Sequence, residues 1–171
     1  IASPATNTDR VLTLPDEAGT VLTSASDLTG VTGVGKVLQL ESNSWSTYLS
    51  TSSTTFTATG KSVTITPTAT SSRILLFISL GIFWNSNNFQ GYGRFTLYRN
   101  GSNIGATDGL ILEGSMQTDS VYTRMVNASF VDSPSSTSAL TYELYVKTSG
   151  DTLYYSDERI KNSIIAMEIA A

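Results

Sequence analysis

Apolar and polar residues alternate along most of this chain, and the alternation predicts β-strands rather than helices. In the segment 61–67, KSVTITP, Val63 and Ile65 fall on one side of the pattern and threonines fall on the other. A period of two residues is that of a strand with one buried face. Similar patterns predict strands at 37–41, 54–60, 61–67, 73–84, 93–101, 120–134, 140–148, 152–157 and 163–170.

Two of these segments predict their buried faces most clearly. In 93–101 we expect Phe95 and Leu97 inside, and Arg94, Thr96 and Tyr98 outside. In 140–148 we expect Tyr142, Leu144 and Val146 inside, and Glu143, Tyr145 and Lys147 outside. The first segment ends in Asn100-Gly101, a pair typical of a two-residue hairpin turn, so the following residues SNIGA are expected to return as its partner.

The segment 73–84, RILLFISLGIFW, is apolar at nearly every position. Such a run is typical of a strand that is covered on both sides, for example by the core on one side and by another subunit on the other. Eight to ten short strands separated by turn residues predict an all-β fold. We therefore expect a β-sandwich or a β-barrel.

Residues 1–36 differ from the rest of the chain. Their only strong apolar pairs are Val11-Leu12 and Val21-Leu22, which are too few to form a core. We expect residues 1–36 to form either a flexible leader or a strand–turn–strand that packs against other chains, ahead of the domain over 37–171. Because the chain begins with Ile1 rather than Met, we also expect it to be part of a longer polypeptide.

Composition excludes several classes of function. The formal charge is −4, and without clustered Lys and Arg we expect no binding to nucleic acid. The longest apolar run is shorter than the roughly 18 residues of a membrane helix, so no membrane insertion is expected, and no signal peptide is recognisable. The chain has no Cys and no His, which removes the usual nucleophile–base pairs and zinc ligands. We expect no cofactor, no metal and no catalysis.

The segment 30–37, GVTGVGKV, comes close to a nucleotide-binding phosphate loop. Such a loop needs a buried strand before it, Ser or Thr after the lysine, and a helix next. Here the preceding residues are polar, Val37 follows the lysine, and the next segment is a predicted strand. We interpret the three glycines as a flexible joint between the two regions of the chain.

The order of these segments is similar to that of bacteriophage tail fibres. The stretch RVLTLPDEAGTVLTSASDLTG resembles segments at the end of a fibre shaft. The stretches GKVLQ, SVTITPTATSSRILLFIS, FTLYRNGSNIG, ASFVDSPSSTSALTYELYV and AMEIA resemble the C-terminal head domains that follow. Together these stretches span nearly the whole chain, and their order carries the resemblance more than any single one.

The resemblance implies a receptor-binding tip on the virion. Residues 1–36 would be a shaft-end or linker segment, and 37–171 would be a head domain folded as an antiparallel, jelly-roll-like β-sandwich. Three identical chains would form a homotrimer and bind a host bacterial receptor outside the cell, a glycan or an outer-membrane component, through three equivalent sites. Two other readings stay open: a monomeric carbohydrate-binding module or adhesin domain, and a purely structural virion protein of a capsid fibre or decoration type. Some phage tips cleave glycans with two facing carboxylates, but neighbouring acids such as Asp157 and Glu158 would diverge on a strand.

The first candidate for receptor contact follows the apolar strand, in the sequence WNSNNFQGYGR. Amide groups interleaved with aromatic rings can bind the hydroxyls and the apolar faces of sugars. The candidate residues are Trp84, Asn85, Asn87, Asn88, Phe89 and Tyr92. The alternative is an ordinary turn whose Asn and Gly residues favour tight backbone conformations, with the aromatic rings in the core.

The second candidate is SGDTLYYSDERIKN. The adjacent residues Tyr154 and Tyr155 should point to opposite sides of a strand, so that one ring faces outward. Asp157 and Arg159 follow in the densest charge cluster of the chain. The alternative is a solvated turn. A third region, 106–120, holds Asp108, Glu113 and Asp119, but their spacing matches no calcium loop.

Overall fold

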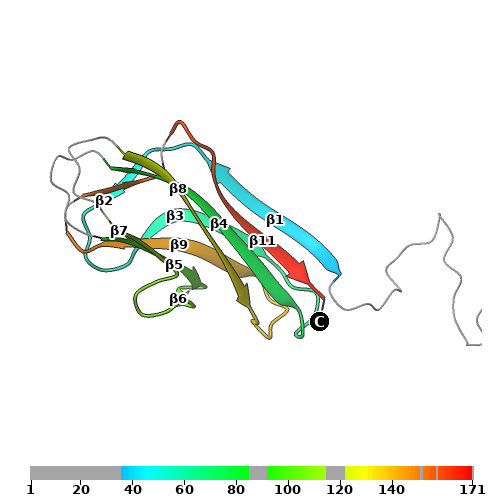
Figure 1. Ribbon diagram of the computed structural model, residues 1–171. Coiled ribbons are helices and arrows are strands. Elements are labelled where there is room, and N and C mark those ends of the chain that lie inside the picture. The colour runs from blue at the N-terminus through cyan, green and yellow to red at the C-terminus, as the bar shows by residue number, and fades with distance from the viewer. Residues whose placement is uncertain (1–35, 85–91, 115–121, 151, 157, 171) are drawn as a thin grey trace, which may run out of the picture. The chain divides into compact units, whose positions relative to one another are not determined.

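The computed structural model of the chain describes residues 36–84, 92–114, 122–150, 152–156 and 158–170. Within these ranges the fold is all-β, with two antiparallel sheets packed face to face (Figure 1). The predicted antiparallel β-sandwich is confirmed. Among the described residues there is no helix that could cross a membrane. The predicted linker over 1–36 lies outside the described residues apart from Lys36, so its boundary with the head domain stays a prediction.

The first sheet is organised around the long strand β4. Its order is β1 (Val37–Trp45), β11 (Asn162–Ile169), β4 (Arg73–Trp84), β10 (Leu153–Tyr155) and β2 (Leu49–Thr51), while β8 (Tyr122–Asp132) pairs with β4 as well. Strands β11 and β10 thus share one edge of β4, and β8 occupies the other. Where β11 gives way to β10, the buried side chain of Asn162 accepts a hydrogen bond from the backbone N–H of Gly81 at 2.8 Å. The side chain therefore takes the place of a missing ladder bond.

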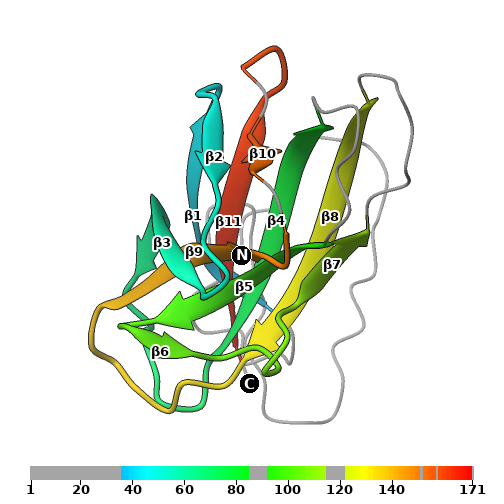
Figure 2. The same ribbon diagram turned by 90° about the vertical axis from the view of Figure 1, so that its left-hand side faces the viewer.

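The second sheet is centred on β9 and β5. Its order is β3 (Thr57–Ile65), β9 (Leu140–Thr148), β5 (Tyr92–Arg99) and β6 (Ser102–Asn103), and β7 (Ile111–Gly114) also pairs with β5. In Figure 2 the sheet that contains β5 and β9 lies in front of the sheet that contains β4 and β8. The sequence predicted the long strands but missed β2 and β7, which are too short to display a period.

The core lies between the sheets and follows the predicted alternation. Every second residue of β9 is buried, beginning with Leu140, as expected from the pattern of 140–148. Strand β4 contributes the inward residues Ile74, Leu76, Ile78, Leu80 and Ile82, each at most 3% exposed. At about 25 cal/mol per Å² of apolar area, such side chains account for most of the drive to fold. The core therefore needs only one face of β4.

Two local expectations are wrong. The segments 54–60 and 61–67 form one strand, β3, with an irregularity between Ala58 and Ser62. Gly60 has a φ of 69° there, and its N–H donates a hydrogen bond to the side chain of Glu143 instead of to a ladder carbonyl. This irregularity interrupts the sequence pattern, so that a single strand was predicted as two. Thr96 was expected outside but is fully buried, because β6 and the following residues cover it and Asn103 accepts its hydroxyl hydrogen bond.

The predicted hairpin at Asn100-Gly101 is confirmed. The two residues have φ values of 48° and 83°, and the register places Arg99 opposite Ser102. Positive φ at both central positions defines the turn type whose twist matches that of a hairpin. This turn fixes where the chain reverses at the edge of the second sheet.

Buried polar groups tie the two sheets together near one end. Asp132 on β8 accepts two hydrogen bonds from Arg99 on β5, at 2.8 and 2.9 Å, and one from the Tyr142 hydroxyl on β9 at 2.7 Å. Burial, followed by the bond to Asp132, raises the pKa of Tyr142 well above its usual value. The pair of sheets is therefore held by a charged hydrogen-bond network as well as by the core.

A second buried carboxylate, Glu168 on β11, lies in the same cross-strand row of the first sheet. It is fully buried and accepts hydrogen bonds from Gln39 on β1, from the Ser72 hydroxyl at 2.6 Å, and from the backbone and hydroxyl of Thr68, both at 2.7 Å. Burial by itself raises the pKa of a carboxyl group, but these donors outweigh it and hold the pKa of Glu168 below its usual value. The carboxylate joins the first strand to the turn before β4.

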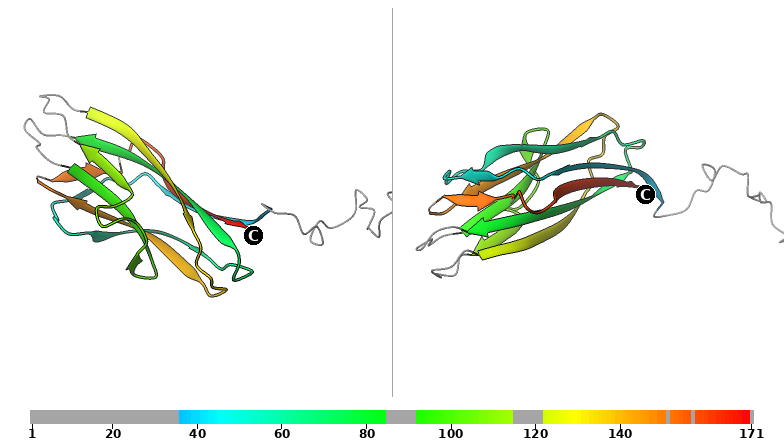
Figure 3. Two further views of the ribbon diagram at one scale, coloured as in Figure 1. Left: turned by 60° about the horizontal axis from the view of Figure 1, so that its bottom comes forward. Right: turned by 90° about the horizontal axis from the view of Figure 1, so that it is seen from above.

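The strand directions define two ends of the sandwich. At the proximal end β1 begins at Val37 beside Ile169, the last residue of β11. At the distal end β4 finishes at Trp84, which is paired with Tyr122 at the start of β8. Strands β2 and β10 lie toward the distal end, as Figure 3 also shows. The chain therefore enters the sandwich opposite the strand ends that flank 85–91 and 115–121.

Candidate functional site

The outer face of the first sheet carries three cross-strand rows, each with one residue from β1, β11, β4 and β8 in that order. The apolar row, nearest the proximal end, consists of Leu40, Met167, Leu75 and Val131. The mixed row consists of Ser42, Ile165, Phe77 and Ser129. The polar row consists of Ser44, Ser163, Ser79 and Asn127. The face thus changes from apolar to hydroxyl-rich toward the distal end.

The apolar residues of this face are open to solvent in the single chain. Leu40 and Val131 are each 53% exposed and Phe77 is 40% exposed. Val37, beside Ile169 at the proximal end, is also exposed. None of the residues in the three rows carries a charge. The row beyond the apolar row contains Val37, Ile169 and the exposed Arg73, so a positive charge borders the apolar surface. A contiguous apolar surface of this kind marks an interaction site in a folded protein.

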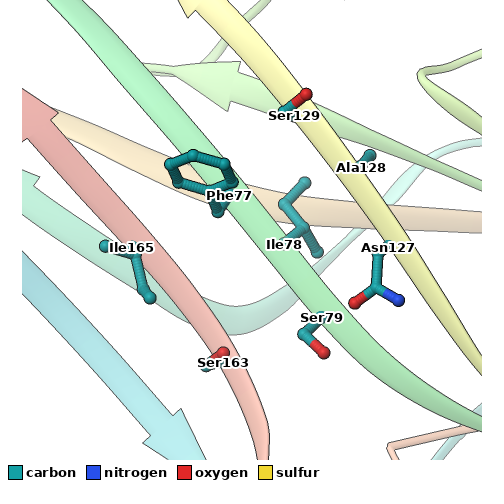
Figure 4. Close-up of a pocket in the computed structure, with 8 residues that line it drawn as sticks. All are labelled: Phe77, Ile78, Ser79, Asn127, Ala128, Ser129, Ser163 and Ile165. Atoms are coloured by element: carbon teal, nitrogen blue, oxygen red, sulfur yellow. The ribbon is translucent and has the colours of Figure 1, made fainter.

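A shallow hollow of about 310 Å³ lies between the mixed and polar rows. Figure 4 shows the side chains around it: Ser163 and Ile165 on β11, Phe77 and Ser79 on β4, and Asn127 and Ser129 on β8. The lining combines one aromatic ring with hydroxyl and amide groups and has no titratable side chain. It can therefore take a neutral ligand or an apolar side chain, but it offers no general acid or base.

At the distal end the same sheet presents a pair of tyrosines. Tyr48, which precedes β2, is 40% exposed, and its ring centroid lies 5.5 Å from that of Tyr154 on β10. Tyr154 is half-buried and faces away from the core, because its strand neighbour Tyr155 faces inward. The two rings are inclined by 32°, so together they form a partly open aromatic surface with phenolic hydroxyls.

The two adjacent tyrosines point to opposite sides of their strand, as expected, but Tyr155 has to be removed from the candidate contacts. It is 4% exposed and packs edge-on against Phe95 of the other sheet, with ring centroids 5.9 Å apart. Burial raises the pKa of its hydroxyl to about 12. Tyr155 is part of the core, and only Tyr154 of the pair can reach a partner.

The candidates of the first region are only partly described. Tyr92 begins β5 at the distal end, is 48% exposed, and has the Arg94 guanidinium 5.8 Å from its ring centroid. Trp84 is the last residue of β4, and its side chain is outside the described part of the structure. The remaining candidates lie outside the described residues; they are Asn85, Asn87, Asn88 and Phe89.

The charged candidates can be placed only in part. Arg159 lies in an exposed turn before β11, and Asp157 is outside the described residues. Asp108 pairs with Arg94 and lies 3.6 Å from the Lys147 ammonium group. Within the described parts of the chain, no group of three acidic side chains is placed to hold a metal ion.

Sequence reasoning missed Tyr48 and most of the outer face. Tyr48 is separated from Tyr154 by more than a hundred residues, and only the pairing of β2 with β10 brings them together. Each row likewise draws its residues from four distant segments. One signal was visible in advance: the strand 73–84 has more apolar residues than a single buried face needs, and Leu75 and Phe77 are the surplus.

No protein-family model matches this chain, and no curated protein matches its sequence. The proposal for its function therefore rests on the arrangement of its own residues together with the segment order noted above.

Proposed function

We propose that this chain is the receptor-binding head of a bacteriophage tail fibre. It acts as a homotrimer on the virion, binds a receptor on the surface of a host bacterium, and catalyses no reaction. The receptor is a glycan or an outer-membrane component.

The observation that supports this proposal best is that the two ends of the sandwich expose different kinds of residue. The chain enters at the proximal end, where the apolar row lies exposed. The exposed tyrosines lie at the distal end, close to the strand ends that flank 85–91 and 115–121. A fibre head needs this polarity, because one end joins the copies to the shaft and the other meets the cell.

The chemistry at the distal end suits a neutral, hydroxyl-rich ligand. Tyr48 and Tyr154 offer ring faces against which the apolar side of a sugar can lie, and their hydroxyls can donate and accept hydrogen bonds. Tyr92 adds a further exposed ring at the same end. A single small site of this kind binds weakly, and three sites on one particle gain affinity through avidity.

The hollow on the outer face favours a second candidate function, that of a monomeric carbohydrate-binding module. Phe77 could lie against a sugar ring while Ser79 and Asn127 form hydrogen bonds with its hydroxyls. In that case the ligand lies on the outer face of the first sheet and not at the distal tyrosines, and the protein needs no further copies. The two proposals therefore make opposite statements about the mass of the particle and about the location of the ligand.

Fluorescently labelled protein, residues 1–171, should bind cells of a susceptible bacterial strain and their purified surface polysaccharide. In the Tyr154→Ala and Tyr48→Ala variants we expect the apparent affinity to fall at least about tenfold, which corresponds to about 1.4 kcal/mol. The matched control is Thr64→Ala, a truncation of an exposed residue on the other sheet. Flow cytometry with a panel of strains gives the measurement.

Two results would count against the proposal. One is the absence of binding to every strain and polysaccharide in a panel that covers several surface types. The other is binding that the tyrosine substitutions leave unchanged while Phe77→Ala or Asn127→Ala abolishes it. The second result would favour the carbohydrate-binding module, with its ligand in the hollow.

A further inference from the structure

The apolar row runs across the whole width of its four-stranded face. It begins with Leu40 on the edge strand β1 and ends with Val131 on the edge strand β8, and these two residues are the most exposed of the row. Met167 and Leu75 lie between them and are half-buried by their neighbours. The apolar row therefore forms an exposed band that reaches both edges of the sheet.

The absence of charge on this band favours a second copy of the chain as its partner. A surface that carries charges of one sign repels itself, whereas the three rows contain only apolar side chains, serines and one asparagine. The whole chain has a net charge of −4, whereas the three rows hold no acidic residue and Arg73 lies in the next row, so copies can approach at this face with less repulsion than at an acidic surface.

The area of the face sets the size of the contact between neighbouring copies. Four strands about 4.8 Å apart and ladders about eight residues long, at about 3.3 Å each, give a flat area of about 500 Å² per copy. Three copies then cover about 1,500 Å² in total, or about 500 Å² at each of the three contacts between neighbours, so the stability of the trimer depends on all three contacts closing together.

The width of the face also fits a threefold arrangement. Three sheets, each about 19 Å wide, that enclose a triangular prism lie about 5.5 Å from its axis, and sheets that pack on one another leave about 5 Å of side chain on each side. Four such sheets would lie about 9.5 Å from the axis and leave a void at this packing distance. Side chains of the size of Leu, Met and Phe fill the threefold prism.

We infer that three copies of the chain enclose a common axis with the outer faces of their β1–β11–β4–β8 sheets. The β1 edge of each copy lies beside the β8 edge of the next, so that Leu40 approaches Val131 of the neighbouring copy. The apolar rows form a closed layer around the axis at the proximal end, and the tyrosine pairs stay at the distal end. The number of copies rests on the proposed homotrimer, while the face and its edges follow from the row.

Cross-linking tests this arrangement directly, because the natural chain has no cysteine. The double variant L40C/V131C of the full chain, treated with a short bis-maleimide, should give mainly covalent trimers on a denaturing gel. Either single variant, L40C or V131C, should give far less cross-linked product. An equimolar mixture of the two single variants should give covalent dimers but no trimers.

The matched control is T64C/S102C, two exposed positions on the edge strands β3 and β6 of the other sheet, which should stay monomeric on the gel. Both altered positions of the test variant are exposed, so folding should persist, and circular dichroism checks this. Only monomers, or dimers without trimers, from a folded double variant would overturn the inference.

The outcome is separable from that of the proposed function. Covalent trimers that bind no bacterial surface would leave the inference standing and overturn receptor binding. A folded monomer that binds polysaccharide through the hollow would overturn the inference. A monomer whose band is covered by residues 1–35 of the same chain would also overturn it, and protection of L40C from maleimide labelling without a trimeric mass would identify that case.

Discussion

At the scale of single residues, the most informative groups are the two buried carboxylates. Asp132 is balanced by Arg99, whereas the carboxylate of Glu168 is balanced by hydrogen-bond donors alone: an amide, two hydroxyls and a backbone N–H. A buried charge is tolerated only when its hydrogen bonds are made. The sequence did not reveal either group, because an acidic residue in an alternating strand looks like an exposed position.

Glu168 gives a prediction about acid stability. Because its folded pKa is lowered, its contribution to stability is complete above its usual value of 4.5 and is lost as the pH falls through the folded pKa. Glu168→Gln should be less stable than the natural chain by about 2 kcal/mol at pH 7. Its stability should also fall less steeply between pH 5 and pH 3, as measured by urea unfolding. Equal acid dependence in the two proteins would contradict this role.

At the scale of elements, the sequence predicted strands well where one face alone is buried. The alternation in β9 gave the buried residues Tyr142, Leu144 and Val146, and the Asn100-Gly101 pair gave the turn between β5 and β6. The alternation failed at Thr96, because β6 and the residues after it cover that side chain. It also failed at Gly60, which interrupts the hydrogen-bond ladder of β3 without ending the strand. Such effects depend on partners that are distant in sequence or on backbone angles.

The hairpin turn gives the second prediction. Gly101 has a φ of 83°, and nothing lies within 4 Å of a Cβ atom placed there. The cost of Gly101→Ala is therefore backbone strain alone, which we expect to lower the unfolding free energy by about 1 kcal/mol. Ser102→Ala, the next residue along, should change it by less than about 0.5 kcal/mol. Chemical denaturation of both variants gives the comparison, and equal effects would contradict the turn geometry.

At the scale of the whole molecule, the surplus apolar residues of 73–84 were the one signal of an interface. The structure places one face of this strand in the core and leaves Leu75 half-buried and Phe77 exposed on the other. The interface itself stays a prediction. The candidate contacts at 85–89 lie outside the described residues, and of the tyrosine pair only Tyr154 faces outward. The rows became visible only when four distant segments were placed side by side.

The native mass of the full chain tests the central claim most directly. Light scattering or native mass spectrometry should give a particle of three times the 18.3 kDa chain mass, and the particle should persist on dilution. Phe77→Lys, which brings three positive charges close to the axis, should convert it to monomers. The exposed substitution Thr64→Lys should not. A natural chain that is a stable monomer at every concentration would contradict the account and leave the outer face to a different ligand.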